Sequence, residues 1–384
     1  MYKAVQRIVS TAVTTARLRR APWLLLLPFL VLVTPSRMRA QEQTSAAQAP
    51  QQFAEFGDFK LQSGAVIHDF RLGYRTVGKL NSAKSNAILW AAYLGGRSED
   101  LLEYVGPRNI ADTTQYFVIL VDSIGNGIST SPSNSKAQPR MRFPEFTMRD
   151  MVESEHRLVA DVLHVAHLHA VLGFSMGGMQ TFEWVTAYPD FMDLGVPMNG
   201  SPQSTSYDKL LWTAEMDALE LDPNWKDGNG AGPMKRGFAL YNEIASMNLT
   251  SPARRVAQTS PRDFQTFLTE TRKSSTGDAR AACDGIRQRQ AIKALDIPGE
   301  YGVTLEQAAQ RTRARLLVVL TLQDHIVNPA PARAFANAIG APVLTIDSPC
   351  GHLSMDCVSI GPIVSKFLAD PASVHSMTLH DAAK

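Results

Sequence analysis

Cysteine is scarce in this chain, whose 384 residues hold only Cys283, Cys350 and Cys357. Three cysteines are too few for a disulfide scaffold, and none stands at a C-x-x-C or Cys/His spacing that would indicate zinc. We expect no metal site, and no motif indicates a cofactor. Cys350 and Cys357 flank His352. The sequence leaves a disulfide and two free thiols equally open for them, because bonding requires Cα atoms closer than about 7 Å.

A strong excess of one charge is also missing. The formal net charge is +2, but seven of the 38 basic residues stand in the first 40 positions, which leaves 31 basic against 36 acidic residues. A mildly acidic remainder gives no electrostatic reason to expect a nucleic-acid partner.

An apolar run of membrane-spanning length is absent as well. The block APWLLLLPFLVLVTP is interrupted by Pro28 and is shorter than the roughly 20 residues of a spanning helix. A basic segment precedes it and the small residue Ala40 follows it, an order that predicts a signal peptide over residues 1–40 and a secreted or periplasmic protein. A retained membrane anchor is the less favoured alternative. Residues 41–55, rich in Gln, Ala and Ser, predict a flexible linker.

What the chain does contain is an alternation of strands and helices. The continuous apolar runs NAILWAAYLGG, YFVILVDSIGNG and HAVLGF predict strands that are covered on both faces of a parallel sheet. Between the last two runs, FTMRDMVESEHRLVADVLHVA has helical spacing, with Thr147 placed to cap its start. Before them, FGDFKLQSGAVIHDFRLGYRTVG predicts an antiparallel hairpin. The alternation predicts an α/β fold with a mostly parallel central sheet flanked by helices.

This rhythm breaks for about a hundred residues. Helical segments and a Gly/Pro/Asn-rich stretch replace the buried strands over residues 201–304, which we expect to form a helical insertion. It separates a first part of the core, residues 56–200, from a second part, residues 305–384. In the second part RLLVVLTLQD and PVLTID predict two more strands.

The stretch VLGFSMGGM, residues 171–179, places a serine at the corner between a strand and a helix. It fits the G-x-S-x-G pattern in which a tight turn exposes the hydroxyl of Ser175 at the edge of the sheet. A serine nucleophile needs a histidine base and an acid that orients it, in the chain order Ser, Asp, His. Asp324 and His352 follow later strands and should lie at the same edge. Asp347 and Asp356 are weaker candidates for the acid.

An oxyanion hole requires two backbone N–H groups aimed at the charge that develops on the substrate. One should come from Met176, directly after the nucleophile, and the other from the loop after ILWAAY. We expect Tyr93 to supply it, with Leu94 as the alternative.

Six blocks of the sequence, taken in order, resemble a known family: IADTTQYFVILVDSIGNGISTSPSN, FTMRDMVESEHRLV, GFSMGGMQTFEWVTAYPD, LDPNWKDG, DHIVNP and GH. They resemble the homoserine O-acetyltransferase-like branch of the α/β-hydrolase superfamily over most of residues 57–370. The resemblance implies an α/β-hydrolase fold, a serine that carries an acyl group, a triad matching Ser175, Asp324 and His352, and a helical lid matching the insertion.

Two positions depart from that family. The place of its amino-acid-binding arginine is taken by Met216, in EMDA, and the aspartate that follows its catalytic histidine is replaced by Leu353. We expect both residues to contact the substrate. An arginine fork suits a carboxylate, so these replacements predict a pocket that is less polar than one for homoserine.

The leading hypothesis is an exported serine hydrolase that cleaves a small-molecule ester, less readily an amide, through an acyl-enzyme on Ser175. One alternative is an O-acyltransferase that uses another acceptor. The other is a catalytically inactive binding protein on a hydrolase scaffold, against which the complete triad argues. We expect no stable membrane anchor, and the sequence leaves a homodimer open.

Overall fold

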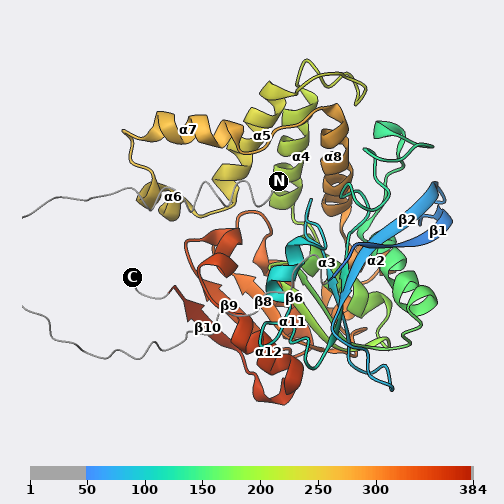
Figure 1. Cartoon of the computed structure of the whole chain (residues 1–384). Coiled ribbons are helices and arrows are strands. Elements are labelled where there is room, and N and C mark those ends of the chain that lie inside the picture. The colour runs from blue at the N-terminus through green and yellow to red at the C-terminus, as the bar shows by residue number, and fades with distance from the viewer. Residues whose placement is uncertain (1–48, 382–384) are drawn as a thin grey trace, which may run out of the picture.

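The computed structural model describes residues 49–381 and is built on one central sheet (Figure 1). The strand order is β1-β2-β4-β3-β5-β6-β8-β9-β10, and β7 pairs with β6. The bounds are β1 Gln52–Lys60, β2 Val66–Val77, β3 Ala87–Ala91, β4 Phe117–Val121, β5 Leu168–Phe174, β6 Met192–Met198, β7 Arg315–Leu316, β8 Val318–Thr321, β9 Val343–Asp347 and β10 Met377–His380.

The sheet is antiparallel at one end and parallel over the rest. β1 pairs with β2, and β2 with β4, in antiparallel register, whereas the pairs from β4 through β10 are parallel. The parallel strands therefore share one carboxyl edge, from which several loops emerge. This arrangement confirms the predicted α/β class and the predicted hairpin.

Two ends of the sheet differ from the prediction. β1 begins at Gln52, inside the segment 41–55 that we expected to be a linker, because Ala54 is buried against the sheet and Gln52 pairs with Tyr74. The expected signal peptide, residues 1–40, lies outside the described residues. The edge strand β10 was not predicted from the sequence, because its side chains are mostly exposed and form no apolar run.

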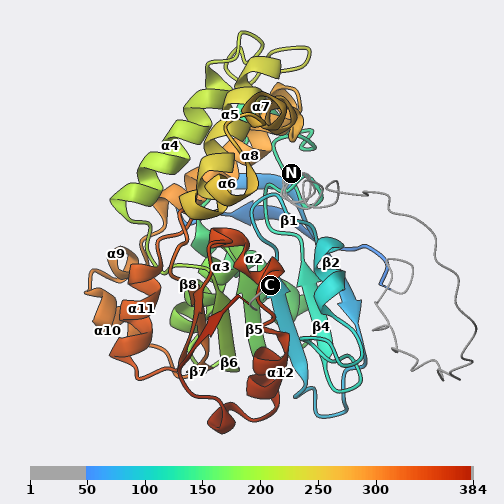
Figure 2. The ribbon, with the colours of Figure 1, turned by 90° about the vertical axis from the view of Figure 1, so that its left-hand side faces the viewer.

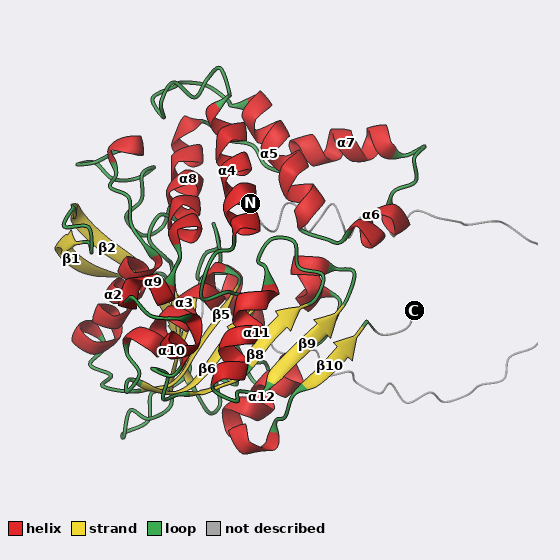
Figure 3. Ribbon diagram, turned by 180° about the vertical axis from the view of Figure 1, so that it is seen from behind, coloured by secondary structure: helices red, strands yellow, loops and turns green. Residues whose placement is uncertain are grey.

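Helices cover both faces of the sheet. α2 (Met148–Arg157), α3 (Met176–Ala187) and α11 (Pro329–Ala338) pack against one face, and α12 (Gly361–Ala369) packs against the other. Figure 3 shows α11 lying across β8. Side chains of β3 alternate between the two cores, Leu89 facing the first and Trp90 the second, as a strand buried on both faces requires.

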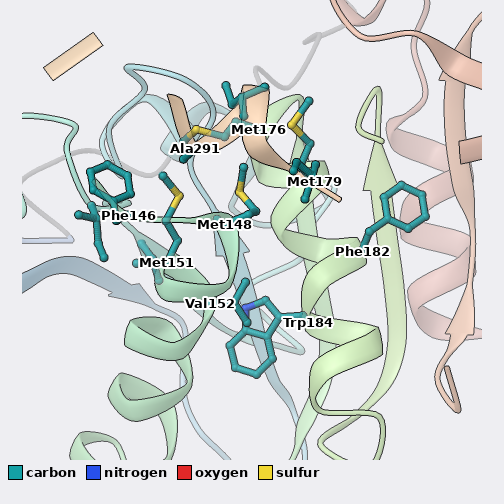
Figure 4. Packing of buried hydrophobic residues seen from close by; sticks show 14 of the residues in the cluster. Phe146, Met148, Met151, Val152, Met176, Met179, Phe182, Trp184 and Ala291 are labelled. Carbon is teal, nitrogen blue, oxygen red and sulfur yellow. The ribbon is translucent and has the colours of Figure 1, made fainter. Parts of the chain in front are cut away.

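The contact between α2 and α3 fixes the helix that follows Ser175. Met148, Met151 and Val152 of α2 lie toward Met176, Met179 and Trp184 of α3 in one buried cluster (Figure 4). α2 starts at a capping box in which Thr147 and Asp150 exchange hydrogen bonds, as its sequence predicted.

The predicted insertion region, between β6 and β7, is helical in the structure. Its helices are α4 Ser206–Glu220, α5 Lys235–Asn248, α6 Pro252–Gln258, α7 Phe264–Lys273, α8 Ala279–Ala294 and α9 Ile297–Tyr301, followed by α10 Leu305–Ala309. α4, α5, α7 and α8 stand above the sheet (Figure 2), with α5 packed against α4 and α7, and α8 against α4. We call α4–α8 the lid. Within residues 49–381 no helix is long and apolar enough to cross a membrane.

Cys350 and Cys357 form a disulfide, with their Cα atoms 6.5 Å apart. Cys283 is a buried free thiol on α8. The structure thus favours the first of the two states that the sequence left open.

We expect one of the three cysteines to react with a thiol reagent when the chain is denatured without a reductant, because the other two are bonded to each other. Counting modified thiols by mass spectrometry checks this, and a reduced and denatured sample, in which three should react, is the control. Three reactive thiols without reductant would contradict the disulfide.

Candidate active site

The turn between β5 and α3 exposes Ser175 through an unusual backbone conformation. Ser175 has φ 56° and ψ −119°, and a positive φ is strained for a residue with a side chain. A Cβ on Gly173 would lie 2.0 Å from the Gly177 oxygen, and a Cβ on Gly177 would lie 2.4 Å from the Ala91 oxygen. The glycines around the serine are therefore needed for backbone contact, as the G-x-S-x-G pattern predicts.

Three predicted side chains meet at the carboxyl edge of the sheet. The Oγ atom of Ser175 lies 2.8 Å from Nε2 of His352, and Nδ1 of His352 lies 2.6 Å from Oδ2 of Asp324. All three residues are less than a tenth exposed. This chain of hydrogen bonds has the geometry in which an imidazole can take the hydroxyl proton while a carboxylate orients it.

Asp324 is held by the loop after β8. Its Oδ1 accepts hydrogen bonds from the N–H groups of Ile326, at 2.8 Å, and Val327, at 2.9 Å, which leaves Oδ2 for His352. The alternative acids lie elsewhere. Asp347 accepts a hydrogen bond from Gln323, and Asp356 lines a small separate pocket.

The loop that carries His352 is fixed from the neighbouring strand ends. Nδ2 of Asn199, just after β6, donates to the backbone oxygen of His352 at 3.3 Å and to the Ser354 hydroxyl at 3.2 Å. The Ser354 hydroxyl also lies 2.5 Å from the hydroxyl of Thr321, at the end of β8. Asn199 was not predicted as a site residue, although its place directly after a buried strand is a usable signal.

The candidate oxyanion residues lie on two segments that contact each other. Tyr93 follows β3, and Met176 is the first residue of α3. Nε2 of Gln180 donates to the backbone oxygens of Ala92 and Met176, at 3.1 and 3.3 Å. This side chain ties the two segments together. Leu94, the alternative to Tyr93, lines the cavity beside Ser175, as Tyr93 does.

A cavity of about 350 Å³ opens above Ser175 and His352. Its walls come from the loops after β3 and β4 and from the lid helices α4, α5 and α8, and lid residues in it include Trp212, Glu215, Tyr241, Asp284, Gln288 and Arg289. None of these six residues was predicted from the sequence. On α8 the cavity-lining residues stand at positions 281, 284, 285 and 288, a spacing that places them on one face of a helix and could have indicated a shared wall.

The two predicted substrate contacts are not in this cavity. Met216 is buried in the core of the lid, and Leu353 lines the small pocket beside Trp90. Glu215 lines the cavity in place of Met216, because successive residues of a helix point about 100° apart. The expectation that Met216 and Leu353 make the pocket apolar is therefore corrected.

Instead, a buried ion pair forms part of the cavity wall. Nε of Arg289 lies 2.7 Å from Oε2 of Glu215. Its other nitrogens donate to the Tyr241 hydroxyl, at 2.8 Å, and to the Gly285 oxygen, at 3.0 Å. Burial raises the pKa of Glu215, and the guanidinium of Arg289 opposes that shift. The charge of the arginine is thus matched within the protein.

Residues 98–356 match the family model of the alpha/beta hydrolase fold. The chain belongs to this family. A relative within the family shows the branch to which the chain belongs. This relative, a homoserine O-acetyltransferase of Geotalea uraniireducens, is 30% identical over 349 residues, which cover 81% of this chain and 94% of that protein. The predicted fold family and its homoserine O-acetyltransferase-like branch are confirmed.

Besides the homoserine O-acetyltransferase, the similar proteins include esterases. A probable esterase of Corynebacterium glutamicum is 34% identical over 205 residues, which span 53% of this chain and only 56% of that protein. The structure of an acetylester hydrolase from the same organism superposes with a TM-score of 0.74 at 26% identity, covering 86% of this chain and 98% of that one. The chain therefore belongs to a branch whose named members include esterases and acyltransferases.

The role of Asp324 can be separated from that of Asp347 by the same substitution at each site. We expect Asp324→Asn to lower kcat by about 10⁴-fold, because an amide no longer holds the imidazole of His352 in the productive tautomer. Asp347→Asn should retain activity within a few-fold. Steady-state kinetics on a chromogenic ester measure both, and the reverse order of effects would show that Asp324 is not the acid.

Proposed function

We propose that this protein is a serine esterase that cleaves a small-molecule ester through an acyl-enzyme on Ser175. The observation that carries the proposal is the hydrogen-bonded chain from Ser175 through His352 to Asp324 at the floor of a cavity. A complete triad argues against the inactive binding protein.

In the first half of the reaction, the Oγ atom of Ser175 attacks the ester carbonyl while Nε2 of His352 accepts its proton. Asp324 stabilises the imidazolium that forms. The backbone N–H groups of Met176 and Tyr93 are the proposed donors to the oxyanion. As the intermediate collapses, His352 passes its proton to the departing alcohol, and the acyl group stays on Ser175.

In the second half, a water molecule attacks the acyl-enzyme. His352 takes a proton from the water, and the acid leaves as the Ser175 hydroxyl regains that proton. An alcohol in place of the water would give acyl transfer. Hydrolysis and transfer therefore differ only in which acceptor the cavity holds.

The cavity wall favours hydrolysis over transfer to an amino acid. The carboxylate of homoserine needs a charged partner once it leaves water, and Arg289 is already engaged by Glu215 and Tyr241. The esterase and acetylester hydrolase among the relatives agree with this choice. An O-acyltransferase with another acceptor is the second candidate, supported by the match to a homoserine O-acetyltransferase over 81% of the chain.

The direct experiment compares hydrolysis of p-nitrophenyl acetate with acetyl transfer from acetyl-CoA to homoserine. We expect hydrolysis by the wild-type protein and a loss of about 10⁴-fold or more in Ser175→Ala. Formation of O-acetylhomoserine should be at least about 10²-fold less efficient, since an unmatched charged group costs one or two strong hydrogen bonds. Rapid O-acetylhomoserine formation with negligible ester cleavage would contradict the esterase proposal.

We also propose that the enzyme is exported and secreted or periplasmic. Support comes from the basic, apolar and small-residue order of residues 1–40 and from the Cys350–Cys357 disulfide, a bond that persists in oxidising compartments.

Cell fractionation followed by N-terminal sequencing tests export. The mature chain should begin near Gln41 and be found outside the cytoplasm, because cleavage after Ala40 removes the leader. An intact Met1 terminus in the membrane fraction would support a retained anchor instead.

A further inference from the structure

One face of α8 forms a wall of the cavity above Ser175. Ala281, Asp284, Gly285 and Gln288 all line it, and their spacing places them on the same side of the helix. Gln288 is engaged at both ends of its amide, since Oε1 accepts from the Gly95 N–H at 2.9 Å and Nε2 donates to the Ile124 oxygen at 3.0 Å. Asp284 is the charged member of this face.

Asp284 has little to balance its charge. Its Oδ1 accepts a hydrogen bond from the Ser133 N–H at 2.8 Å, and within residues 49–381 no ion pair joins it to an arginine, lysine or histidine. Burial raises the pKa of Asp284 to about 7, although hydrogen bonds from the side chain and the backbone of Ser133 oppose that shift. Asp284 is only partly exposed, and a carboxylate that is partly shielded from water is stabilised by a cation that enters the cavity.

The other charged groups near this wall are accounted for. Glu215 and Arg289 neutralise each other, and Arg97 is exposed, so that water screens its charge. Asp278 raises the pKa of Asp284 further. The neighbouring residue on α8, Cys283, is influenced by Arg140 and Arg287 as well as by Asp284. Arg140 donates to backbone oxygens, and Arg287 pairs with Glu145. His352 is committed to Asp324 and Ser175.

We propose that Asp284 is a specificity-determining residue that selects esters carrying a cationic group, such as an ammonium, in the part of the molecule that lies along α8. The proposal rests on the esterase activity proposed above and names its substrate class. It also implies that an anionic group in the same place is disfavoured, because the carboxylate of Asp284 would repel it.

Acetylcholine and 3,3-dimethylbutyl acetate form a suitable pair of probes. They have the same shape and the same acyl group and differ in one positive charge. We expect the wild-type protein to show a higher kcat/KM for the cationic ester. In Asp284→Asn the ratio of the two kcat/KM values should fall by about tenfold, the usual effect of losing one interaction with a charged group. Glu270→Gln, at an exposed site on α7, is the control and should keep the wild-type ratio.

The wild-type ratio should also depend on pH. Below pH 7 Asp284 is mostly protonated and offers no charge, and above pH 7 it is ionised, so the preference for the cationic ester should increase as the pH rises through about 7. In Asp284→Asn the ratio should not change with pH. The wild-type profile tests the role without any substitution, so a variant that fails to fold does not prevent the test.

The ratio separates selection from a purely structural role. Loss of the hydrogen bond to Ser133 would slow both esters equally and leave the ratio unchanged, which would overturn the proposal. The proposal would also be overturned if the protein cleaved p-nitrophenyl acetate but showed no preference between acetylcholine and 3,3-dimethylbutyl acetate. The same holds if it cleaved p-nitrophenyl acetate but neither of these two esters. Failure to cleave p-nitrophenyl acetate would instead contradict the esterase function itself.

Discussion

The strained backbone at Ser175 is the constraint on which the other parts of the site depend. Its positive φ costs on the order of 1–3 kcal/mol, and the surrounding structure must enforce it. β5 and α3 do so through backbone contacts at Gly173 and Gly177 that leave no room for a Cβ. The Ser175 N–H also donates to the Met198 oxygen at 2.8 Å, which fixes the corner against β6. The position of the hydroxyl is thus a property of the packed sheet.

Because the parallel strands end at one edge, the proposed acid and base, Asp324 and His352, reach that corner from later in the chain. This explains why the sequence predicted so much of the site: buried strands are recognisable as apolar runs, and the residues that follow them must gather at one edge. Asp324 and His352 could be named on that ground. The lid could not be treated in the same way, since the direction of a side chain on a helix depends on packing against other helices. The sequence predicted Met216 in the cavity wall, and the structure places the neighbouring residue Glu215 there. A shift of one position along a helix thus replaces an apolar side chain with a carboxylate.

The same division separates what the site does from what it acts on. In the proposed mechanism the hydrogen-bonded chain at the sheet edge carries out acyl transfer to any acceptor, whereas the cavity walls come largely from α4, α5 and α8. There an arginine and a glutamate satisfy each other, and one carboxylate on α8 has no cation beside it among the described residues. A count of apolar or charged residues in the lid would not reveal this pattern, because the effect of a buried charge depends on the groups that pair with it.

The lid is nevertheless joined to the catalytic machinery at its base. The Ser251 N–H, at the start of α6, donates to the Pro349 oxygen at 3.0 Å, and Arg254 donates to Sγ of Cys350 at 2.8 Å. Gly351 has a φ of 61°, and a Cβ there would lie 3.0 Å from Thr250. The segment that precedes α6 therefore packs directly against the loop that carries His352. A displacement of α6 would disturb these contacts, so the position of the loop that carries His352 depends on this end of the lid as well as on the sheet.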